Sequence, residues 1–117
     1  MFARVTTIQA SAGKLDALVR VYEKTVLPAA ATEQGFRGTY LLTDRGRSKC
    51  VAVTFWETED DALANEASGY YQQQVDKVRH FLTTPPMREG YDVAVQDTTT
   101  QDVQVIPMAA PPQSATP

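Results

Sequence analysis

The chain has 117 residues, a formal net charge of -3 at pH 7, one cysteine and one histidine. This length fits one domain, and the absence of any basic block argues against nucleic acid or a membrane surface as a partner. A lone cysteine cannot form an intrachain disulfide, and a lone histidine excludes a multi-histidine metal site, so we expect no metal. The chain start lacks a secretory signal pattern and no apolar run is long enough to span a bilayer, so the expected location is cytoplasmic.

The first third of the chain is typical of a strand followed by a helix. Residues 2–9 are rich in β-branched types and lead into the small residues 10–13, which favours a strand-to-helix turn. From Lys14 onward, apolar residues recur at spacings of three and four, which predicts one buried helix face. These residues are Leu15, Leu18, Val19, Tyr22, Val26 and Leu27. We expect Ser11 to cap this helix and Pro28 to kink it or end its regular part.

A hairpin and a second helix are expected next. Residues 36–43 and 49–56 are strand-like and should pair antiparallel, with Gly46 supplying the positive φ of the turn between them. Thr58 precedes three carboxylates, a pattern that predicts the beginning of a helix. Gly69 is expected to interrupt that helix, whose second piece ends before a pair of prolines.

The last predicted strand covers residues 89–97, where Tyr91, Val93 and Val95 alternate with smaller or polar residues as in a half-buried strand. The resulting order βαββαβ predicts an α+β fold of the ferredoxin-like type over residues 1–97, with a four-stranded antiparallel sheet and two helices on one face. The remaining residues contain four of the seven prolines. They predict a Pro-rich tail at 98–117, in which 102–106 could add a short extended arm to a sheet edge.

The strand at 49–56 has apolar groups on both faces. Val51, Val53 and Phe55 form a uniformly apolar set suited to dry packing, while Cys50, Ala52 and Trp56 alternate with them. We expect Arg4, Thr6 and Ile8 to lie beside the second set, which mixes apolar bulk with hydrogen-bonding groups. A pocket is therefore expected on the mixed face and a partner surface on the other.

Several short segments resemble the antibiotic biosynthesis monooxygenase (ABM) family. They are Val26-Leu27-Pro28, Glu33-Gln34-Gly35-Phe36, Leu41-Leu42 and Phe55-Trp56-Glu57-Thr58-Glu59-Asp60, within a likeness covering roughly residues 2–97. The resemblance implies a homodimeric α+β barrel, in which two sheets pack face to face and each subunit keeps a pocket between its sheet and its helices.

The resemblance also implies two kinds of chemistry. Some family members oxidise quinols and polycyclic phenols with molecular oxygen and no cofactor, and others bind and degrade haem. The haem branch uses an asparagine, a tryptophan and a histidine, and the matching places hold Thr6, a residue near Asn65 and one of Gln72 to Gln74. The cofactor-free branch uses an asparagine and a tryptophan on the third strand, where this chain has Ala52 and Trp56.

Candidate site residues follow from their chemistry, although no catalytic residue is assigned. Trp56 could stack a small aromatic substrate, or it could be a core anchor. Thr6, Asn65, Tyr70 and Tyr71 could supply hydrogen bonds to phenol or quinone oxygens, or serve as caps and packing residues. His80 is a possible base, or it could complement the dipole at a helix C-terminus, which we favour. Buried Cys50 is expected to pack rather than react.

Three functions remain open. The leading hypothesis is a cofactor-independent monooxygenase that acts on a small aromatic or quinol substrate in an apolar pocket. The alternative is a non-catalytic dimeric ligand-binding or stress-response module, and the third is a haem-binding or haem-degrading relative. The expected partners are a second copy of the chain and a small aromatic molecule.

Overall fold

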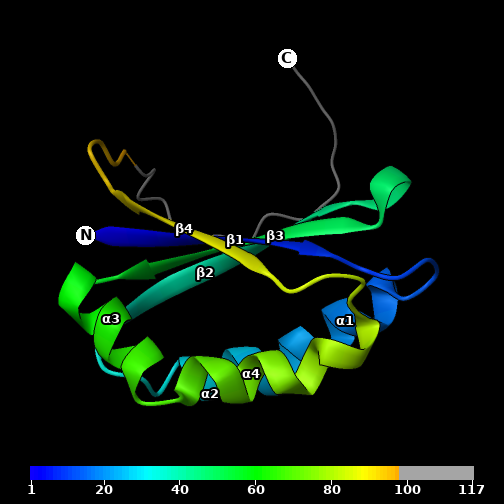
Figure 1. Ribbon diagram of the computed structural model, residues 1–117. Coiled ribbons are helices and arrows are strands. Elements are labelled where there is room, and N and C mark those ends of the chain that lie inside the picture. Colours follow the sequence, from blue (N-terminus) through cyan, green and yellow to red (C-terminus); the bar gives the residue numbers. More distant parts are fainter. Residues whose placement is uncertain (98–117) are drawn as a thin grey trace.

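A computed structural model describes residues 1–97 and confirms the predicted fold class. Its elements are β1 (Phe2–Gln9), α1 (Leu15–Val21), a π-helical turn η1 (Tyr22–Val26), α2 (Leu27–Ala30), β2 (Phe36–Asp44), a 3-10 turn η2 (Arg45–Arg47), β3 (Lys49–Trp56), α3 (Glu59–Ala67), α4 (Tyr70–Val78), a 3-10 turn η3 (Arg79–Phe81) and β4 (Met87–Asp92). The strands form one antiparallel sheet in the order β2-β3-β1-β4. All helices lie on one side of that sheet (Figure 1).

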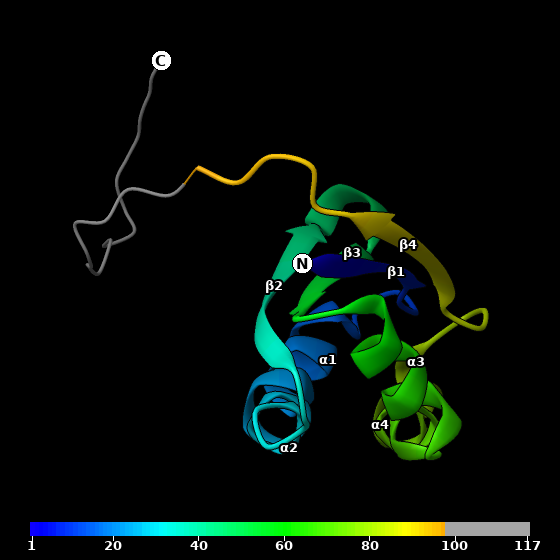
Figure 2. The same cartoon turned by 90° about the vertical axis from the view of Figure 1, so that its left-hand side faces the viewer.

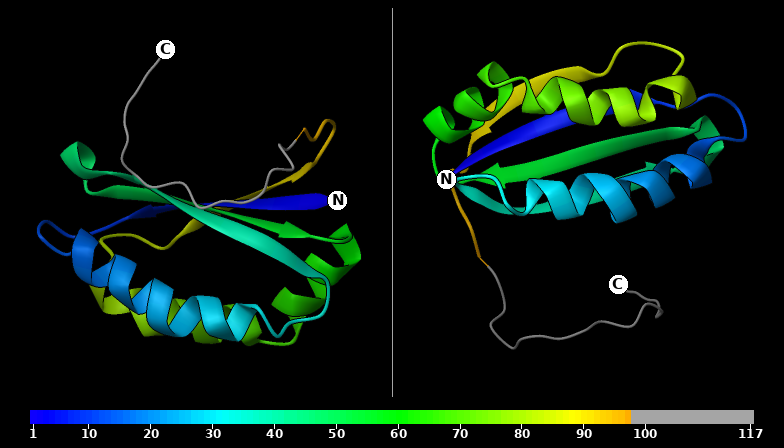
Figure 3. Two further views of the ribbon diagram at one scale, coloured as in Figure 1. Left: turned by 180° about the vertical axis from the view of Figure 1, so that it is seen from behind. Right: turned by 90° about the horizontal axis from the view of Figure 1, so that it is seen from below.

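The helices form two rods beneath the sheet. Viewed along the rods, α1 and α2 lie on the β2 side, and α3 and α4 lie on the β4 side (Figure 2). From below, the central strands β1 and β3 are visible between the two rods (Figure 3). The two central strands therefore cover the space between the two rods, which the helices bound on both sides.

The first helix differs from expectation at its start. Ser11 does not cap it, because the carbonyl of Ser11 closes a turn with the N–H of Lys14 at 3.0 Å and regular helix begins only at Leu15. The break near Pro28 takes the form of the π-turn η1. Since Pro28 has no N–H to continue the α pattern, one extra residue is wound in, and the N–H of Leu27 reaches back to the carbonyl of Tyr22.

The hairpin is paired as predicted, but Gly46 does not supply its positive φ. The Asp44 carboxylate accepts a hydrogen bond from the N–H of Arg47 at 3.3 Å and closes the 3-10 turn η2. The left-handed residue is Ser48, with φ of 51°. A turn of this length places the left-handed position after the 3-10 segment rather than at the glycine.

The second helical rod begins and breaks where predicted. The hydroxyl of Thr58 accepts a hydrogen bond from the N–H of Asp61 at 3.1 Å, which caps α3. Gly69 has φ of 86° and separates α3 from α4. The two pieces therefore have different directions, and each can contribute its own face to the space below the sheet.

The last strand is shorter than predicted and begins earlier. It covers Met87–Asp92 instead of 89–97, because its partner β1 begins at Phe2, which pairs with Asp92. Beyond that point only Met1 remains, whose carbonyl accepts a hydrogen bond from the N–H of Val93 at 3.0 Å. The expected half-buried alternation is seen only at Val93, since Tyr91 is 51% and Val95 is 86% exposed in the single chain. The possible arm at 102–106 lies outside the described residues.

The helix side of the sheet has two separate apolar clusters. One contains Ile8, Leu18 and Cys50 at one end of the central strands, and the other contains Phe2 and Trp56 at the opposite end. The register pairs Ile8 with Cys50 and Phe2 with Trp56, so the clusters are separated along the strands by residues 4–6 and 52–54. Among residues 1–97, no helix has the length and apolar character needed to cross a membrane.

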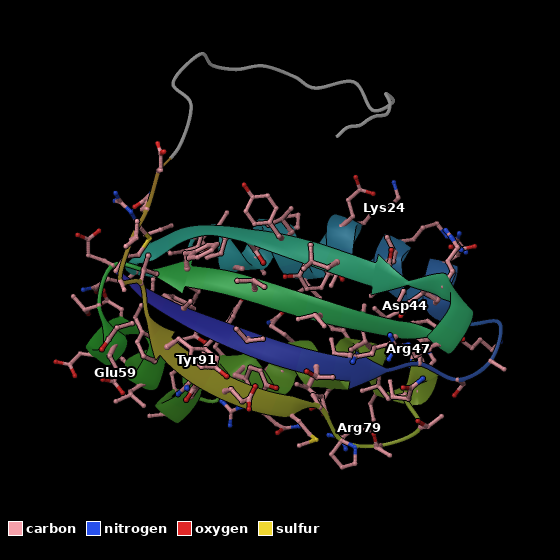
Figure 4. The ribbon with its side chains drawn as sticks, turned by 90° about the horizontal axis from the view of Figure 1, so that it is seen from above. Lys24, Asp44, Arg47, Glu59, Arg79 and Tyr91 are labelled. Atoms are coloured by element: carbon pink, nitrogen blue, oxygen red, sulfur yellow. The ribbon has the colours of Figure 1, made fainter. Side chains whose placement is uncertain are left out.

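The other face of the sheet has no described element over it. Figure 4 looks onto this face, with Tyr91 of β4 at one edge. The large apolar side chains that it exposes include Tyr40, Leu42, Met87 and Tyr91, which are between 51% and 71% exposed. Val51, Val53 and Phe55 lie between them and are only half-buried. We call these seven residues the open face.

One glycine position is fixed by close packing as well as by backbone angle. Gly35 has φ of 81°, and a Cβ built on it would lie 2.2 Å from the carboxylate oxygen of Asp61 in the first turn of α3. Gly13 has a similar φ of 77° but open space around the same position. Comparing substitutions at Gly35 and Gly13 therefore separates the cost of backbone strain, which both share, from the cost of displacing α3, which applies only at Gly35.

We predict that Gly35→Ala lowers the free energy of unfolding more than Gly13→Ala. Both substitutions carry the strain of a positive φ, about 1 to 3 kcal/mol, but only the first also displaces Asp61. Denaturant unfolding of both variants measures the difference. Equal losses in the two variants would contradict the packing of residue 35 against α3.

Candidate functional site

The candidate site lies between the two apolar clusters, under the middle of the central strands. There the helix-facing positions are Arg4 and Thr6 on β1 and Ala52 and Thr54 on β3, paired Arg4 with Thr54 and Thr6 with Ala52. These side chains are small or polar, so they do not fill the layer as Ile8 and its neighbours do. A pocket of about 110 Å³ remains.

All five residues predicted to bind substrate line this pocket. They are Thr6, Trp56, Asn65, Tyr70 and Tyr71. The remaining lining residues come from both rods, from the helix side of the sheet and from the segment before β4. They are Arg4, Ile8, Tyr22, Val26, Ala30, Ala52, Thr54, Glu66, Gln74, Val75, Val78, Pro86 and Arg88.

Trp56 is a core residue that also lines the pocket, so its packing role is observed and substrate stacking stays a prediction. It is 5% exposed and packs in the apolar cluster with Phe2 and Ala62. Its ring meets that of Phe36 edge to face, with centroids 6.0 Å apart. Another part of the same side chain lines the pocket. The tryptophan is thus held rigidly by the core and presents part of its surface to the cavity.

A cluster of three charges forms one wall. Glu66 of α3 accepts hydrogen bonds from Arg4, with Nε to Oε2 at 2.6 Å and Nη2 to Oε1 at 3.0 Å, and pairs with Arg88 at 3.0 Å. The hydrogen bond to Glu66 raises the pKa of Arg4. Arg88 also lies 4.1 Å from the centre of the Tyr71 ring. Two guanidinium groups share one carboxylate, so this wall has one net positive charge.

Hydroxyl and amide groups also line the pocket. They come from η1 in the first helical rod, from β3 and from α3. The Tyr22 and Thr39 hydroxyls lie 2.9 Å apart, and Thr39 in turn lies 3.2 Å from the Thr54 hydroxyl. Asn65, which is 8% exposed, donates from Nδ2 to the carboxylate of Glu33 at 3.1 Å. These contacts fix the positions of Tyr22, Thr54 and Asn65 at the pocket wall.

Two further polar groups on α4 lack such partners. The Tyr70 hydroxyl and Gln74 Oε1 are buried and have no hydrogen-bond partner among the described residues. Burial, reinforced by the nearby Glu33, raises the pKa of Tyr70 to about 12. Tyr70 therefore carries its proton at neutral pH and can donate a hydrogen bond.

The structure separates His80 from this site. His80 is exposed in η3, its ring is tilted by 42° against that of Phe81 with centroids 4.0 Å apart, and it is not among the residues that line the pocket. We therefore discard it as a base for chemistry in this cavity. Cys50 is 1% exposed and burial raises the pKa of its thiol to about 11, as expected of a packing residue. Within residues 1–97 no group of three potential metal ligands comes together.

A second hollow of about 420 Å³ adjoins the first. Tyr71, Val75, Pro86 and Arg88 line both, and the outer one extends over η3 and the residues before β4. The stacked pair of Arg88 and Tyr71 thus stands where the inner pocket meets the outer hollow.

Sequence reasoning missed Glu66, Arg88 and Gln74 as site residues. Glu66 follows Ala62 by four positions on α3, so it lies on the helix face that is buried, and this spacing was an available signal. Arg88 could not be placed because β4 was expected to begin after it. Gln74 lies four residues after Tyr70 on one face of α4, in a stretch of three glutamines that periodicity alone does not distinguish.

Comparison of the fold with solved structures finds the same architecture in several proteins. A putative antibiotic biosynthesis monooxygenase from Nitrosomonas europaea is 17% identical with a TM-score of 0.68, covering 81% of this chain and 100% of that one. The monooxygenase ActVA-Orf6 of Streptomyces coelicolor, in complex with nanaomycin D, is 16% identical with a TM-score of 0.69, over 85% and 92% of the chains. A MhuD variant with two manganese protoporphyrin IX molecules bound per active site is 18% identical with a TM-score of 0.69, over 85% and 100%. At these identities the likeness establishes the fold.

Sequence comparison extends the likeness. The uncharacterized protein Rv2557 of Mycobacterium tuberculosis is 35% identical over 94 residues, which is 76% of this chain and 39% of that protein. Rv2558 of the same organism is 36% identical over 58 residues, 50% of this chain and 25% of that protein. This chain therefore matches well under half the length of these relatives. The family model for antibiotic biosynthesis monooxygenase matches residues 1–77, and since that is more than half of the chain, the chain belongs to this family.

Proposed function

We propose that the pocket between sheet and helices binds a small phenol or quinol and that the protein oxidises it with molecular oxygen, without a bound cofactor. The observation that supports this most directly is the pocket itself, in which the indole of Trp56 and apolar side chains surround a few fixed polar groups. Its volume of about 110 Å³ suits a ligand of about one aromatic ring, since an engineered cavity of about 150 Å³ holds benzene.

The charges at the wall favour the reactive form of such a ligand. A phenol becomes a better electron donor when it loses its proton, and the net positive charge of Arg4, Glu66 and Arg88 offsets part of the cost of burying the phenolate. Burial still raises the pKa of Tyr71, whose ring contacts Arg88, although both arginines act in the opposite direction. In the overall reaction, phenol and O₂ give a quinone and water, so one oxygen atom enters the product and the substrate supplies all the electrons. The protein then needs only to orient the substrate, favour its anion and exclude water.

A non-catalytic binding module is the second candidate. Ala52 stands at the pocket wall where the resemblance to the cofactor-free branch implies an asparagine, and Ala52 cannot hydrogen-bond through its side chain. A module of this kind would use the same pocket without turnover. Haem has less support, because His80, the chain's one histidine, does not line the pocket.

We expect oxygen consumption when the protein is mixed with a panel of one-ring and two-ring phenols and quinols, measured with an oxygen electrode. Trp56→Phe should reduce the rate because it shrinks the aromatic wall, whereas His80→Ala should leave the rate unchanged. Binding of these compounds with no oxygen uptake above the protein-free rate would favour the non-catalytic module. A Soret band on titration with haem would favour the third candidate.

We also propose that two copies of the chain associate through the open face. That face exposes large apolar residues on β2 and β4, with half-buried ones on β3, and monomeric proteins rarely expose large apolar patches. A symmetric dimer would bury the same patch on both copies. It would leave both pockets on the outer sides, beneath their own helices.

Sedimentation velocity at micromolar concentration should therefore give a dimer. Leu42→Glu should shift it towards monomer, because Leu42 is 52% exposed in the single chain and lies on the open face. Leu63→Glu is the matched control, since Leu63 is 45% exposed but lies on α3. A wild-type monomer, or equal effects of the two substitutions, would contradict an interface at the open face.

A further inference from the structure

The side chain of Gln74 is a buried amide whose oxygen has no partner. Gln74 is 9% exposed, it lines the pocket, and Oε1 makes no hydrogen bond with the described residues. The hydroxyl of Tyr70, one helical turn earlier, is buried and unpartnered in the same way. Both side chains therefore lie on the pocket face of α4.

Such groups are costly unless something satisfies them. Leaving one buried donor or acceptor without a hydrogen bond costs about 1 to 3 kcal/mol, and most buried polar groups in proteins have a partner. Several other polar groups of the wall are already engaged: Arg4 and Arg88 with Glu66, and Asn65 with Glu33. Among the described residues, Gln74 and Tyr70 differ from these groups because each has a buried polar side-chain atom without a hydrogen-bond partner.

The chemistry of the two groups defines what they can recognise. A primary amide offers both a donor and an acceptor, and a protonated tyrosine hydroxyl does the same. Burial raises the pKa of Tyr70 to about 12, so it stays neutral at physiological pH. Neither group carries a charge that would select an ion. A hydroxyl group, which also donates and accepts, is the complementary ligand group.

We propose that Gln74 and Tyr70 are the specificity-determining residues of the pocket and that they select a ligand by a hydroxyl group directed at α4. The ring of that ligand lies against Trp56 and Ala52. This inference rests on the proposed ligand pocket but not on turnover. It also distinguishes the two sides of the cavity: the hydroxyl faces the neutral α4 groups, and any second oxygen lies towards Arg88.

The test compares two ligands of nearly the same shape, p-cresol and toluene, which differ in one hydroxyl group. Their affinities are measured without oxygen, from the emission of Trp56, the chain's one tryptophan. We expect p-cresol to bind about tenfold more tightly per hydrogen bond formed, because a net hydrogen bond contributes about that factor. The ratio of the two affinities is used because damage to the fold affects both ligands.

Gln74→Leu and Tyr70→Phe should each reduce the ratio, by about the factor that one hydrogen bond contributes. Gln73→Leu is the matched control, because Gln73 is an exposed glutamine on the same helix, and the wild-type ratio should be retained. An unchanged ratio in both Gln74→Leu and Tyr70→Phe would overturn the inference and indicate that water alone satisfies these groups.

The outcomes also separate this inference from the proposed function. A hydroxyl preference that depends on Gln74, together with no oxygen uptake, supports the inference and refutes the monooxygenase. Equal binding of p-cresol and toluene to the wild type refutes the inference and leaves the pocket intact. Binding of neither ligand refutes both.

Discussion

The site depends on one constraint: the middle of the helix-facing side of the sheet is not filled by apolar side chains. Ile8 and Cys50 pack against one end of the helix layer, and Phe2 and Trp56 pack against the other. Between them the strands carry Thr6, which is polar, and other short or charged side chains. Because protein interiors are otherwise close-packed, two anchored ends with an unfilled middle leave a cavity at a defined place.

Charge pairing holds the walls of that cavity in place. Glu66 links α3 to β1 through Arg4 and to β4 through Arg88, and the three side chains are only 18% to 35% exposed. Because one carboxylate pairs with two guanidinium groups, the net charge of this wall is only +1. The same contacts place Arg88 over Tyr71, where the inner pocket meets the outer hollow. The stability of the fold and the electrostatic potential inside the pocket therefore depend on the same three residues, Arg4, Glu66 and Arg88.

The sequence predicted the fold class from local patterns, and the resemblance to the ABM family led to the five candidate residues that line the pocket. Alternation on the strand at 49–56 separates Ala52 and Trp56 from the open face, and the Thr58 cap places α3. The errors came from positions whose structure depends on residues that are distant in the sequence. The end of β4 depends on where β1 begins, which no pattern in residues 87–97 records. The unpartnered state of Gln74 depends on what surrounds it, and a stretch of glutamines contains no sign of that.

The family and the fold leave the reaction open, since proteins of this fold include one bound to nanaomycin D and one bound to manganese protoporphyrin. What this chain itself contributes is a small cavity between two apolar clusters. The most direct test is a titration of isotope-labelled protein with hydroquinone, without oxygen, followed by the chemical shifts of backbone amides. The largest changes are predicted at Thr6, Ala52 and Gln74. Changes centred on Leu42 and Val53 of the open face, or none at all, would contradict the assignment of this cavity as the ligand site.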